Sequence, residues 1–416
     1  MNNLKGTCII GQSGGPTAVI NASAYGAIKT ALESPNITRV LGAAHGIVGV
    51  LNDILYDMGE EDPEELALLL NTPSSELGSC RYKLKDPEQN DSEYRKILEI
   101  FQKYDVRYFF YNGGNDSMDT CSKISRFMSK SGYDCRVIGI PKTIDNDLAG
   151  TDHCPGFGSA AKYIATSLME IYKDSTVYDI GTITIVETMG RHAGWLAGSA
   201  GIAAAFGSGP DLVYLPEVSF NLDTFLLDCE RLYRQNGKVL AVVSEGIKDK
   251  DGVFISEYGA KKNNRVDSFG HMQLGGLAAA LAEVVKERTG AKVRGIELSL
   301  LQRCAAHIAS QTDITEAFEA GKAAVEAAVS GQTGKMVAFK REDIDGKYAF
   351  RTILIPLEDA ANHEKKVPLE WINENGNGVT QAFIDYALPL IQGEPDKALC
   401  SSLPRFAKLK KIRVSG

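Results

Sequence analysis

The chain has 416 residues, of which 44% are hydrophobic and 24% charged, and its formal net charge is −8. This is the composition of an ordinary globular protein that is long enough for two or three α/β units. The acidic balance argues against a general binder of nucleic acid or of anionic membranes, so any phosphate chemistry must depend on local positive charge.

The ends of the chain and its cysteines favour a cytoplasmic protein. Residues 1–5 are not followed by an apolar region with a cleavage site, so we expect no signal peptide. The most apolar window, residues 195–206, is too short to span a bilayer. The eight cysteines are scattered and form no Cys-x-x-Cys pair, which favours reduced thiols over disulfides or a zinc site.

Short apolar runs alternate with amphipathic stretches, which predicts βα units and a mostly parallel sheet. The predicted strands are, in chain order, residues 7–11, 106–111, 137–140, 182–186 and 239–243. Helices are expected over about residues 17–32 and 118–128, and an Ala-rich helix after Arg191. Polar or glycine residues follow each strand at once. Since ligands of open α/β sheets bind at the carboxyl ends of the strands, we expect the chemistry at these five loops.

Three further stretches are interpreted as structural. Residues 60–65 (EEDPEE) predict the start of a solvated helix with Pro63 near its first position. The basic residues 408–413 are interpreted as a solvated or edge segment, with an anion site as the alternative. From about Gly331 onward the pattern changes, and we interpret this stretch as additional packing or an accessory layer and infer no chemistry from it.

Two glycine pairs, Gly14–Gly15 and Gly113–Gly114, each lie between a predicted strand and a helix. Glycine permits positive φ and a close approach of backbone N–H groups to an anion, and a helix N-terminus favours a phosphate. The alternative is a tight turn that needs glycine only for steric reasons. Neither pair matches the standard P-loop or dinucleotide-binding motif.

The residues after the second glycine pair are Asn115, Asp116 and Ser117. A carboxylate at position 116 should repel a phosphate bound beside it, and a helix N-cap formed by Asp116 or Ser117 is the alternative interpretation. The neutral oxygen of Asn115 could reach a Mg²⁺ ion carried by phosphates.

Residues 141–147 (PKTIDND) place one lysine and two aspartates directly after a predicted buried strand. Two carboxylates in one loop can divide their roles between a general base and a metal or solvent contact. Lys142 can supply a point charge for a phosphoryl group in transfer. A surface loop with an internal salt bridge is the alternative.

Charged residues also follow the later strands. Arg191 is expected at a helix start, where it could bind a phosphate, and Glu245 could bind sugar hydroxyls. Arg294 and Arg303 could hold a second phosphate, although for these two residues alone solvated helix or strand-end arginines are the favoured interpretation.

Together, these stretches resemble the phosphofructokinase family over about residues 11–313. The motifs that carry the resemblance stand in the family's order: GGNDS at 113–117, PKTIDND at 141–147, MGR at 189–191, SEG at 244–246 and QR at 302–303. The resemblance implies two Rossmann-like three-layer α/β domains with mostly parallel sheets and an active site in the cleft between them. Residues 1–150 with about 304–345 would bind the phosphoryl donor, residues 151–303 the sugar phosphate, and residues 346–416 would form an accessory segment.

The resemblance also assigns roles by position. Asp145 would remove the proton from the 1-hydroxyl of fructose 6-phosphate, with Lys142 and Asp116 as further catalytic residues and Asn115 as a contact of the Mg²⁺ cofactor. The residues implied around the sugar phosphate are Thr143, Ile144, Met189, Gly190, Arg191, Glu245, Arg294, Leu300, Leu301, Gln302 and Arg303. Those implied around the donor are Gly14, Gly15, Arg81 and Gly114. Arg294 matches an arginine that reaches the 6-phosphate from a neighbouring subunit, which implies a homodimer or homotetramer.

Asp116 and Lys142 resemble the pyrophosphate-dependent branch of the family. Members that use ATP resemble GGDGS at the first motif and carry a small residue at the position of Lys142. A carboxylate ~4 Å from the α-phosphate of ATP would repel it by about 4 kcal/mol at an effective dielectric near 20. The charge of Lys142 would stabilise the smaller pyrophosphate. The implied reaction is the reversible phosphorylation of fructose 6-phosphate by pyrophosphate, in glycolysis or gluconeogenesis.

Three positions depart from the family pattern. Asn115 stands where the family usually has a Mg²⁺-binding aspartate, Leu300 replaces a histidine or tyrosine, and Thr182 replaces an arginine. A longer acceptor such as sedoheptulose 7-phosphate is therefore an alternative. Two other alternative functions are an ATP-dependent sugar-phosphate kinase and a catalytically silent paralogue that binds sugar phosphate. The intact Lys142, Asp145 and Arg191 argue against the silent paralogue.

Overall fold

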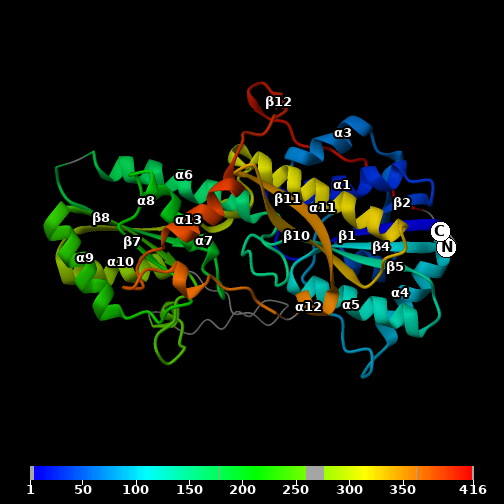
Figure 1. The fold of residues 1–416 in the computed structure, drawn as a ribbon, viewed down its shortest axis with the longest axis horizontal. Coiled ribbons are helices and arrows are strands. Elements are labelled where there is room, and N and C mark those ends of the chain that lie inside the picture. The colour runs from blue at the N-terminus through cyan, green and yellow to red at the C-terminus, as the bar shows by residue number, and fades with distance from the viewer. Residues whose placement is uncertain (1–3, 178, 259–275, 362, 415–416) are drawn as a thin grey trace.

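A computed structural model describes residues 4–177, 179–258, 276–361 and 363–414. The chain forms two α/β halves that lie side by side, each built around its own sheet (Figure 1). Both termini lie at the outer end of the first half. This arrangement confirms the fold class expected from the sequence.

The sheet of the first half has seven strands in the order β11-β10-β5-β4-β1-β2-β3. The bounds are β1 Gly6–Gln12, β2 Ile37–Ala43, β3 Leu55–Asp57, β4 Val106–Gly113, β5 Arg136–Pro141, β10 Lys335–Ile344 and β11 Lys347–Pro356. The inner strands are parallel, whereas the edge strands β3 and β11 run antiparallel to their neighbours. Because β1 and β4 are buried along their length, helices must cover both faces of this sheet.

Helices α1 (Ile20–Glu33) and α11 (Gln311–Val329) cover one face, and α4 (Ser92–Lys103) and α5 (Asn115–Lys130) cover the other (Figure 1). The two helices α1 and α11 pack closely, since a Cβ atom at Gly26 would stand 2.1 Å from the carbonyl oxygen of Phe318. The first half is therefore a three-layer unit.

The sheet of the second half has four parallel strands in the order β7-β8-β6-β9. Their bounds are β6 Thr182–Thr188, β7 Leu212–Tyr214, β8 Lys238–Ser244 and β9 Lys292–Glu297. One face packs on α6 (Phe157–Ser175), α7 (Trp195–Gly198) and α8 (Ala200–Ala205). The other face packs on α9 (Leu222–Asn236) and α10 (Leu277–Thr289), so the second half also has three layers.

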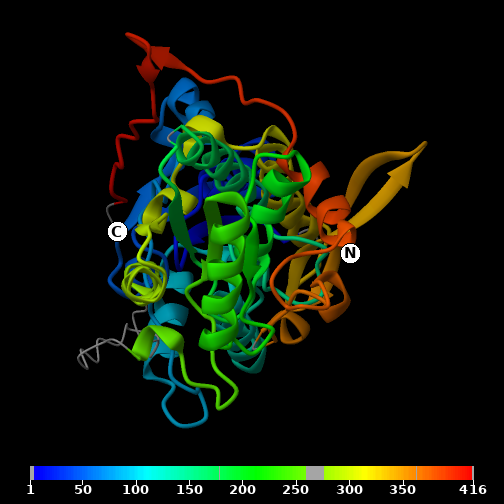
Figure 2. The same ribbon diagram turned by 90° about the vertical axis from the view of Figure 1, so that its left-hand side faces the viewer.

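The C-terminal region is part of both halves. Strand β10 pairs with β5, and the β10–β11 hairpin extends beyond the body of the molecule (Figure 2). The domain boundary expected near residue 345 falls in the turn of this hairpin, whose second strand belongs to the same sheet as the first. After α12 (Leu357–Ala360) the chain crosses to the second half (Figure 1), where α13 (Gln381–Ala387) packs.

The strands predicted from the sequence are all present, and the helix starts needed correction. The helix expected from residue 17 begins at Ile20, because residues 13–19 form the turn that follows β1. The helix expected from residue 118 begins at Asn115, with Gly114 at the N-cap, so the alternative of Asp116 or Ser117 as the N-cap was wrong. The Ala-rich stretch after Arg191 forms the two short helices α7 and α8.

The expectations for residues 60–65 and for the basic tail are confirmed. Pro63 opens α3 (Pro63–Ala67), and the side chain of Asp62 caps it by accepting from Glu64 N–H at 2.9 Å. The basic tail runs along the edge of the first sheet, where Asp57 N donates to Ile412 O at 3.0 Å. All eight cysteines are free. In the described part of the chain, no helix is both long and apolar enough to cross a membrane.

Candidate active site

The loops at the carboxyl ends of the strands meet in a cleft of about 600 Å³ between the two halves. Its lining includes twelve of the residues singled out from the sequence: Gly14, Gly15, Arg81, Gly114, Asn115, Asp116, Lys142, Thr143, Asp145, Met189, Arg191 and Glu245. It also includes Lys83, Ser117, Asp147, His192 and Glu364. The five loops at which the sequence analysis expects the chemistry therefore lie together around one cleft.

Lys142 joins the loops that follow β1 and β5, although β4 lies between those two strands. Its ammonium is buried and donates to Gly15 O at 2.6 Å. Gly14 has φ +77°, and a Cβ atom there would stand 3.3 Å from Lys142 Nζ. Burial lowers the pKa of Lys142 to about 8, although Asp145 and Asp147 act in the opposite direction. The glycine pair therefore leaves room for a buried cation.

Arginine and lysine side chains add positive charge around the same glycines. A Cβ atom at Gly15 would stand 3.3 Å from Nη1 of Arg303, so the Arg303 guanidinium lies against this loop. Arg81 and Lys83 line the cleft beside it. These groups supply the local positive charge that an anionic ligand needs in an acidic protein.

Asp116 lies in the first turn of α5 and is ion-paired with Lys83, whose Nζ is 3.6 Å from Asp116 Oδ1. The side chain of Asp116 is 31% exposed, so this pair is in contact with solvent. The sequence-based estimate of repulsion by Asp116 took no account of Lys83. The pair reduces that repulsion while keeping the carboxylate in the cleft.

The two carboxylates of the PKTIDND loop are both half-buried and line the cleft. Burial raises the pKa of Asp145 to about 7, and the charges of Asp147 and Glu245 add to the effect. Burial likewise raises the pKa of Asp147 above its usual value. The alternative interpretation of this loop was a salt bridge within it. Instead, the Lys142 ammonium donates to Gly15 O, outside the loop, and within the loop Asp145 N donates to Thr143 Oγ1 at 3.1 Å. A carboxyl with a pKa near neutrality suits a general base.

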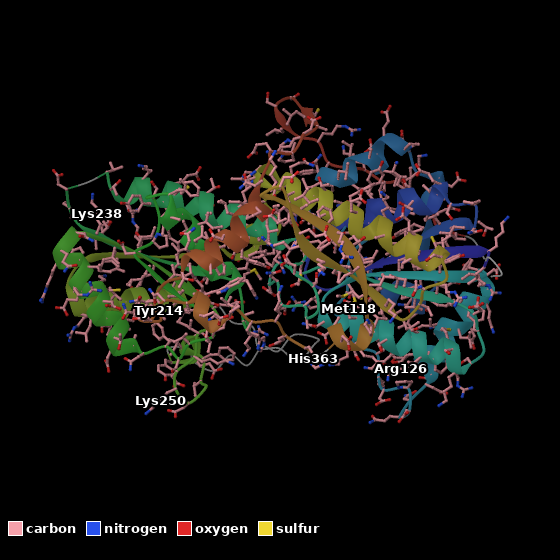
Figure 3. The ribbon with its side chains drawn as sticks, in the orientation of Figure 1. Met118, Arg126, Tyr214, Lys238, Lys250 and His363 are labelled. Atoms are coloured by element: carbon pink, nitrogen blue, oxygen red, sulfur yellow. The ribbon has the colours of Figure 1, made fainter. Side chains whose placement is uncertain are left out.

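Asn115 connects α5 to the C-terminal region. Its amide nitrogen donates to Ala360 O at 2.7 Å and to His363 O at 3.1 Å, in the orientation that satisfies both ends of the amide. Figure 3 places His363 between α5 and the second half. The other end of the amide is 3.5 Å from Asp147 Oδ2. In this orientation that end is the oxygen, so an amide oxygen and a carboxylate lie side by side.

This pair bears on metal binding. The described residues contain no group of three or more His, Cys, Asp or Glu that could enclose a metal ion. Mg²⁺ is commonly held by one or two carboxylates together with the phosphate oxygens of a substrate. Asp147 and the oxygen of Asn115 fit that kind of site.

The second half supplies the other wall of the cleft. Gly190 has φ +123° and donates through its N–H to Glu245 Oε1 at 3.2 Å, while Ser244 Oγ donates to Gly190 O at 2.5 Å. Burial raises the pKa of Glu245. Arg191 follows in the turn before α7, which begins only at Trp195, so the expectation that Arg191 starts a helix was wrong.

Several sequence-predicted residues lie outside the cleft wall. Ile144 packs in the core of the second half, and Gln302 is buried where its Oε1 accepts from Met189 N at 3.1 Å. Leu300 and Leu301 are more than half exposed. Arg294 pairs with Asp174 at 3.5 Å beside a separate hollow of about 290 Å³. Within one chain, therefore, Arg294 is not part of the cleft.

Sequence reasoning missed three of the lining residues, namely Lys83, His192 and Glu364. Lys83 and His192 each stand next to or near a predicted residue, so adjacency to Arg81 and Arg191 could have pointed to them. Glu364 comes from the C-terminal region, and no local pattern marks it. Its Oε1 is 4.0 Å from His192 Nδ1, across the boundary between the two halves.

Comparison with known proteins agrees with this geometry. The phosphofructokinase family model matches residues 7–327. The pyrophosphate–fructose 6-phosphate 1-phosphotransferase of Halomonas elongata is 45% identical over 97% of this chain and 96% of its own length. The crystal structures of pyrophosphate-dependent phosphofructokinases from Marinobacter aquaeolei and Nitrosospira multiformis superpose with TM-scores of 0.88 and 0.89. Their identities are 40% and 39%, and each comparison covers 99% of this chain and 98% of the other. The chain belongs to the phosphofructokinase family.

Proposed function

We propose that this protein transfers a phosphoryl group from pyrophosphate to the 1-hydroxyl of fructose 6-phosphate, reversibly, in the cytoplasm. The names of relatives that are 45% identical over nearly the whole chain support both substrates. The cleft supports the same reaction, because it brings a base of raised pKa together with several cations.

The observation that carries the choice of donor is the buried ammonium of Lys142 against the Gly14–Gly15 loop. A small dianionic or trianionic group gains most from a buried point charge, since the low-dielectric surroundings strengthen the attraction. Asp116 adds a carboxylate to the same cleft, which disfavours a donor that continues into further phosphates and a nucleoside. Both features favour pyrophosphate over ATP.

In this proposal the first half binds the donor and the second half binds the acceptor. Gly14, Gly15, Arg81 and Gly114 hold pyrophosphate. Asp145 removes the proton of the 1-hydroxyl while the hydroxyl oxygen attacks the nearer phosphorus atom of pyrophosphate. The bond between that phosphorus and the bridging oxygen breaks, and inorganic phosphate leaves. Lys142 stabilises the charge on the transferred group.

The acceptor is held by groups from three loops. The side chains of Arg191 and Arg303 bind its phosphate, because a guanidinium can contact two phosphate oxygens at once. Glu245, Thr143 and Met189 contact the sugar.

We include Mg²⁺ as the cofactor. Asp147 and the oxygen of Asn115 would hold it, together with phosphate oxygens of the donor. When bound, it neutralises charge on the phosphates. The half-buried carboxylates of Asp145 and Asp147 repel one another, and a cation near Asp147 would reduce this repulsion.

We also propose a homodimer or homotetramer in which Arg294 reaches the acceptor site of a neighbouring subunit. Strand β9, which carries Arg294, is an edge strand, and its side chains are exposed or half-buried. The exposed Leu300 and Leu301 follow it. These features leave a surface at which a second copy can pack.

A donor panel tests the proposal. Purified protein with fructose 6-phosphate and Mg²⁺ should form fructose 1,6-bisphosphate from pyrophosphate and very little from ATP. Fructose 1,6-bisphosphate with inorganic phosphate should yield pyrophosphate in the reverse assay. Turnover with ATP that equals or exceeds turnover with pyrophosphate would overturn the donor assignment.

A further inference from the structure

The residue between the two cleft carboxylates has an unusual conformation. Asn146 is fully buried and has φ +54°, in the left-handed region that asparagine adopts more readily than most residues. Its Oδ1 accepts from Cys154 N at 2.9 Å, and its Nδ2 donates to Tyr386 Oη at 2.8 Å. The left-handed conformation of Asn146 bends the chain between its two neighbours. Both neighbours, Asp145 and Asp147, line the cleft.

Tyr386 fastens this loop from α13, which is 240 residues further along the chain. Its hydroxyl accepts from Asn146 and donates to Asp152 O at 2.7 Å, so one oxygen holds two points of the loop. The ring is held among aromatic side chains, with its centroid 5.1 Å from that of Trp195 and 5.2 Å from that of Trp371. This packing leaves the hydroxyl little freedom to move.

Lys365 fastens the same loop from a second place in the C-terminal region. Its backbone N–H donates to Asp147 O at 2.7 Å, and its ammonium donates to Thr151 O at 3.2 Å and to Asp152 O at 2.6 Å. Its own carbonyl accepts from Trp195 Nε1 at 2.9 Å, which ties it to the second half. Three groups, the N–H and ammonium of Lys365 and the hydroxyl of Tyr386, thus make five hydrogen bonds to residues 146–152.

We propose that Tyr386 and Lys365 are positioning residues that hold the loop of residues 145–153, so that Asp145 and Asp147 face the cleft. The loop is irregular, and its carbonyl oxygens at 147, 151 and 152 are satisfied by the C-terminal region rather than by a sheet or helix. The C-terminal region, from which the sequence analysis inferred no chemistry, thereby supports the loop that carries the proposed base. The inference rests on the proposed role of Asp145 as the base, because its effect on turnover is exerted through that carboxylate.

The test compares two tyrosine hydroxyls that each contact two groups. Tyr386→Phe removes the oxygen that joins Asn146 to Asp152. Tyr133→Phe is the control, because the half-buried Tyr133 hydroxyl contacts Phe101 O and Val106 O, both at 2.9 Å, away from the cleft. Each protein is assayed with pyrophosphate, fructose 6-phosphate and Mg²⁺, and hydrogen–deuterium exchange is followed over residues 145–154.

For Tyr386→Phe we expect kcat to fall by about tenfold to a hundredfold, since small misplacements of a reacting group have effects of that size. KM for fructose 6-phosphate should change less than twofold, and amides of residues 145–154 should exchange faster. Tyr133→Phe should leave kcat and this exchange at the wild-type values. Lys365→Met, which keeps the length of the side chain without its ammonium, should reproduce the effects of Tyr386→Phe.

Two outcomes would overturn the positioning role: a kcat of Tyr386→Phe within twofold of that of Tyr133→Phe, or unchanged exchange in the loop. Failure of the proposed function is recognised separately, because the wild-type protein would then show no turnover with pyrophosphate. In that case the exchange measurement alone decides, since it requires no catalysis.

Discussion

The ammonium of Lys142 donates to the carbonyl oxygen of Gly15, 127 residues earlier in the chain, at 2.6 Å. This contact brings the end of β5 to the end of β1 across the intervening strand β4. The contact places the buried Lys142 ammonium beside the Gly14–Gly15 loop. Without it, this loop would present only backbone N–H groups to a phosphate. The assignment of pyrophosphate as the donor depends most on this contact.

Replacing both donor-discriminating residues tests that assignment. In Asp116→Gly with Lys142→Gly, we expect kcat/KM for pyrophosphate to fall by about a hundredfold or more, as for the loss of a preorganised group that stabilises transition-state charge. Some use of ATP should appear, because the carboxylate and the ammonium no longer occupy the cleft. Steady-state kinetics with both donors measure the effect, and unchanged kinetics with pyrophosphate would contradict the roles of both residues.

The single variant Asp116→Gly separates the two contributions. It frees Lys83, which is 3.6 Å from the Asp116 carboxylate. Because an added free cation attracts any polyphosphate, binding of both donors should tighten in this variant, and ATP should gain more than pyrophosphate.

Removal of the proposed base tests the chemical step. Asp145→Ala and the nearly isosteric Asp145→Asn should lower turnover by about 10²- to 10⁴-fold, the usual contribution of a general base. Fructose 6-phosphate should still bind, because Arg191 and Glu245 remain, and calorimetry measures that binding. Turnover within tenfold of the wild-type rate would mean that Asp145 is not the base.

The raised and lowered pKa values predict a narrow pH optimum. Asp145, with a pKa of about 7, must be ionised to act as a base, so kcat/KM should rise as the pH increases through about 7. Lys142, with a pKa of about 8, must be protonated, so kcat/KM should fall as the pH increases through about 8. In Lys142→Arg the alkaline limb should move to much higher pH, because a guanidinium stays charged. An alkaline limb that stays in place would show that Lys142 is not the group responsible.

Arg294 tests the proposed contact between subunits. Arg294→Ala should raise KM for fructose 6-phosphate at least about tenfold, the loss expected for a charge-assisted contact worth 1.5–3 kcal/mol. KM for pyrophosphate should hardly change. Arg288→Ala is the control, because Arg288 is also about half exposed and paired with a carboxylate on the second half.

Mixing two impaired proteins gives a sharper result. Subunits with Arg294→Ala retain Asp145, and subunits with Asp145→Ala retain Arg294. At a low concentration of fructose 6-phosphate, hybrid oligomers should therefore be more active than either protein alone, since one cleft receives both residues. Light scattering establishes the oligomeric state of each sample. If the mixture is no more active than the average of its components, Arg294 does not act across an interface.

The relation between sequence and structure differs from loop to loop. The five strand ends could be predicted, because each buried strand and the polar residues after it are contiguous and parallel strands end at one edge of a sheet. Their partners could not. The Lys83–Asp116 pair and the bonds from Asn115 to Ala360 and His363 join segments that have no common local pattern.

The C-terminal region shows the same limit most clearly. Its change of pattern after Gly331 predicted an accessory layer, yet β10 and β11 join the first sheet, Glu364 lines the cleft and Tyr386 holds Asn146. The sequence by itself determined the family and the two α/β halves, and it supplied the residues proposed for phosphoryl transfer, because all of these depend on short contiguous motifs. Only the tertiary structure decided which distant groups neutralise, bury and hold those residues, because such hydrogen bonds form between segments that meet only when the two halves pack.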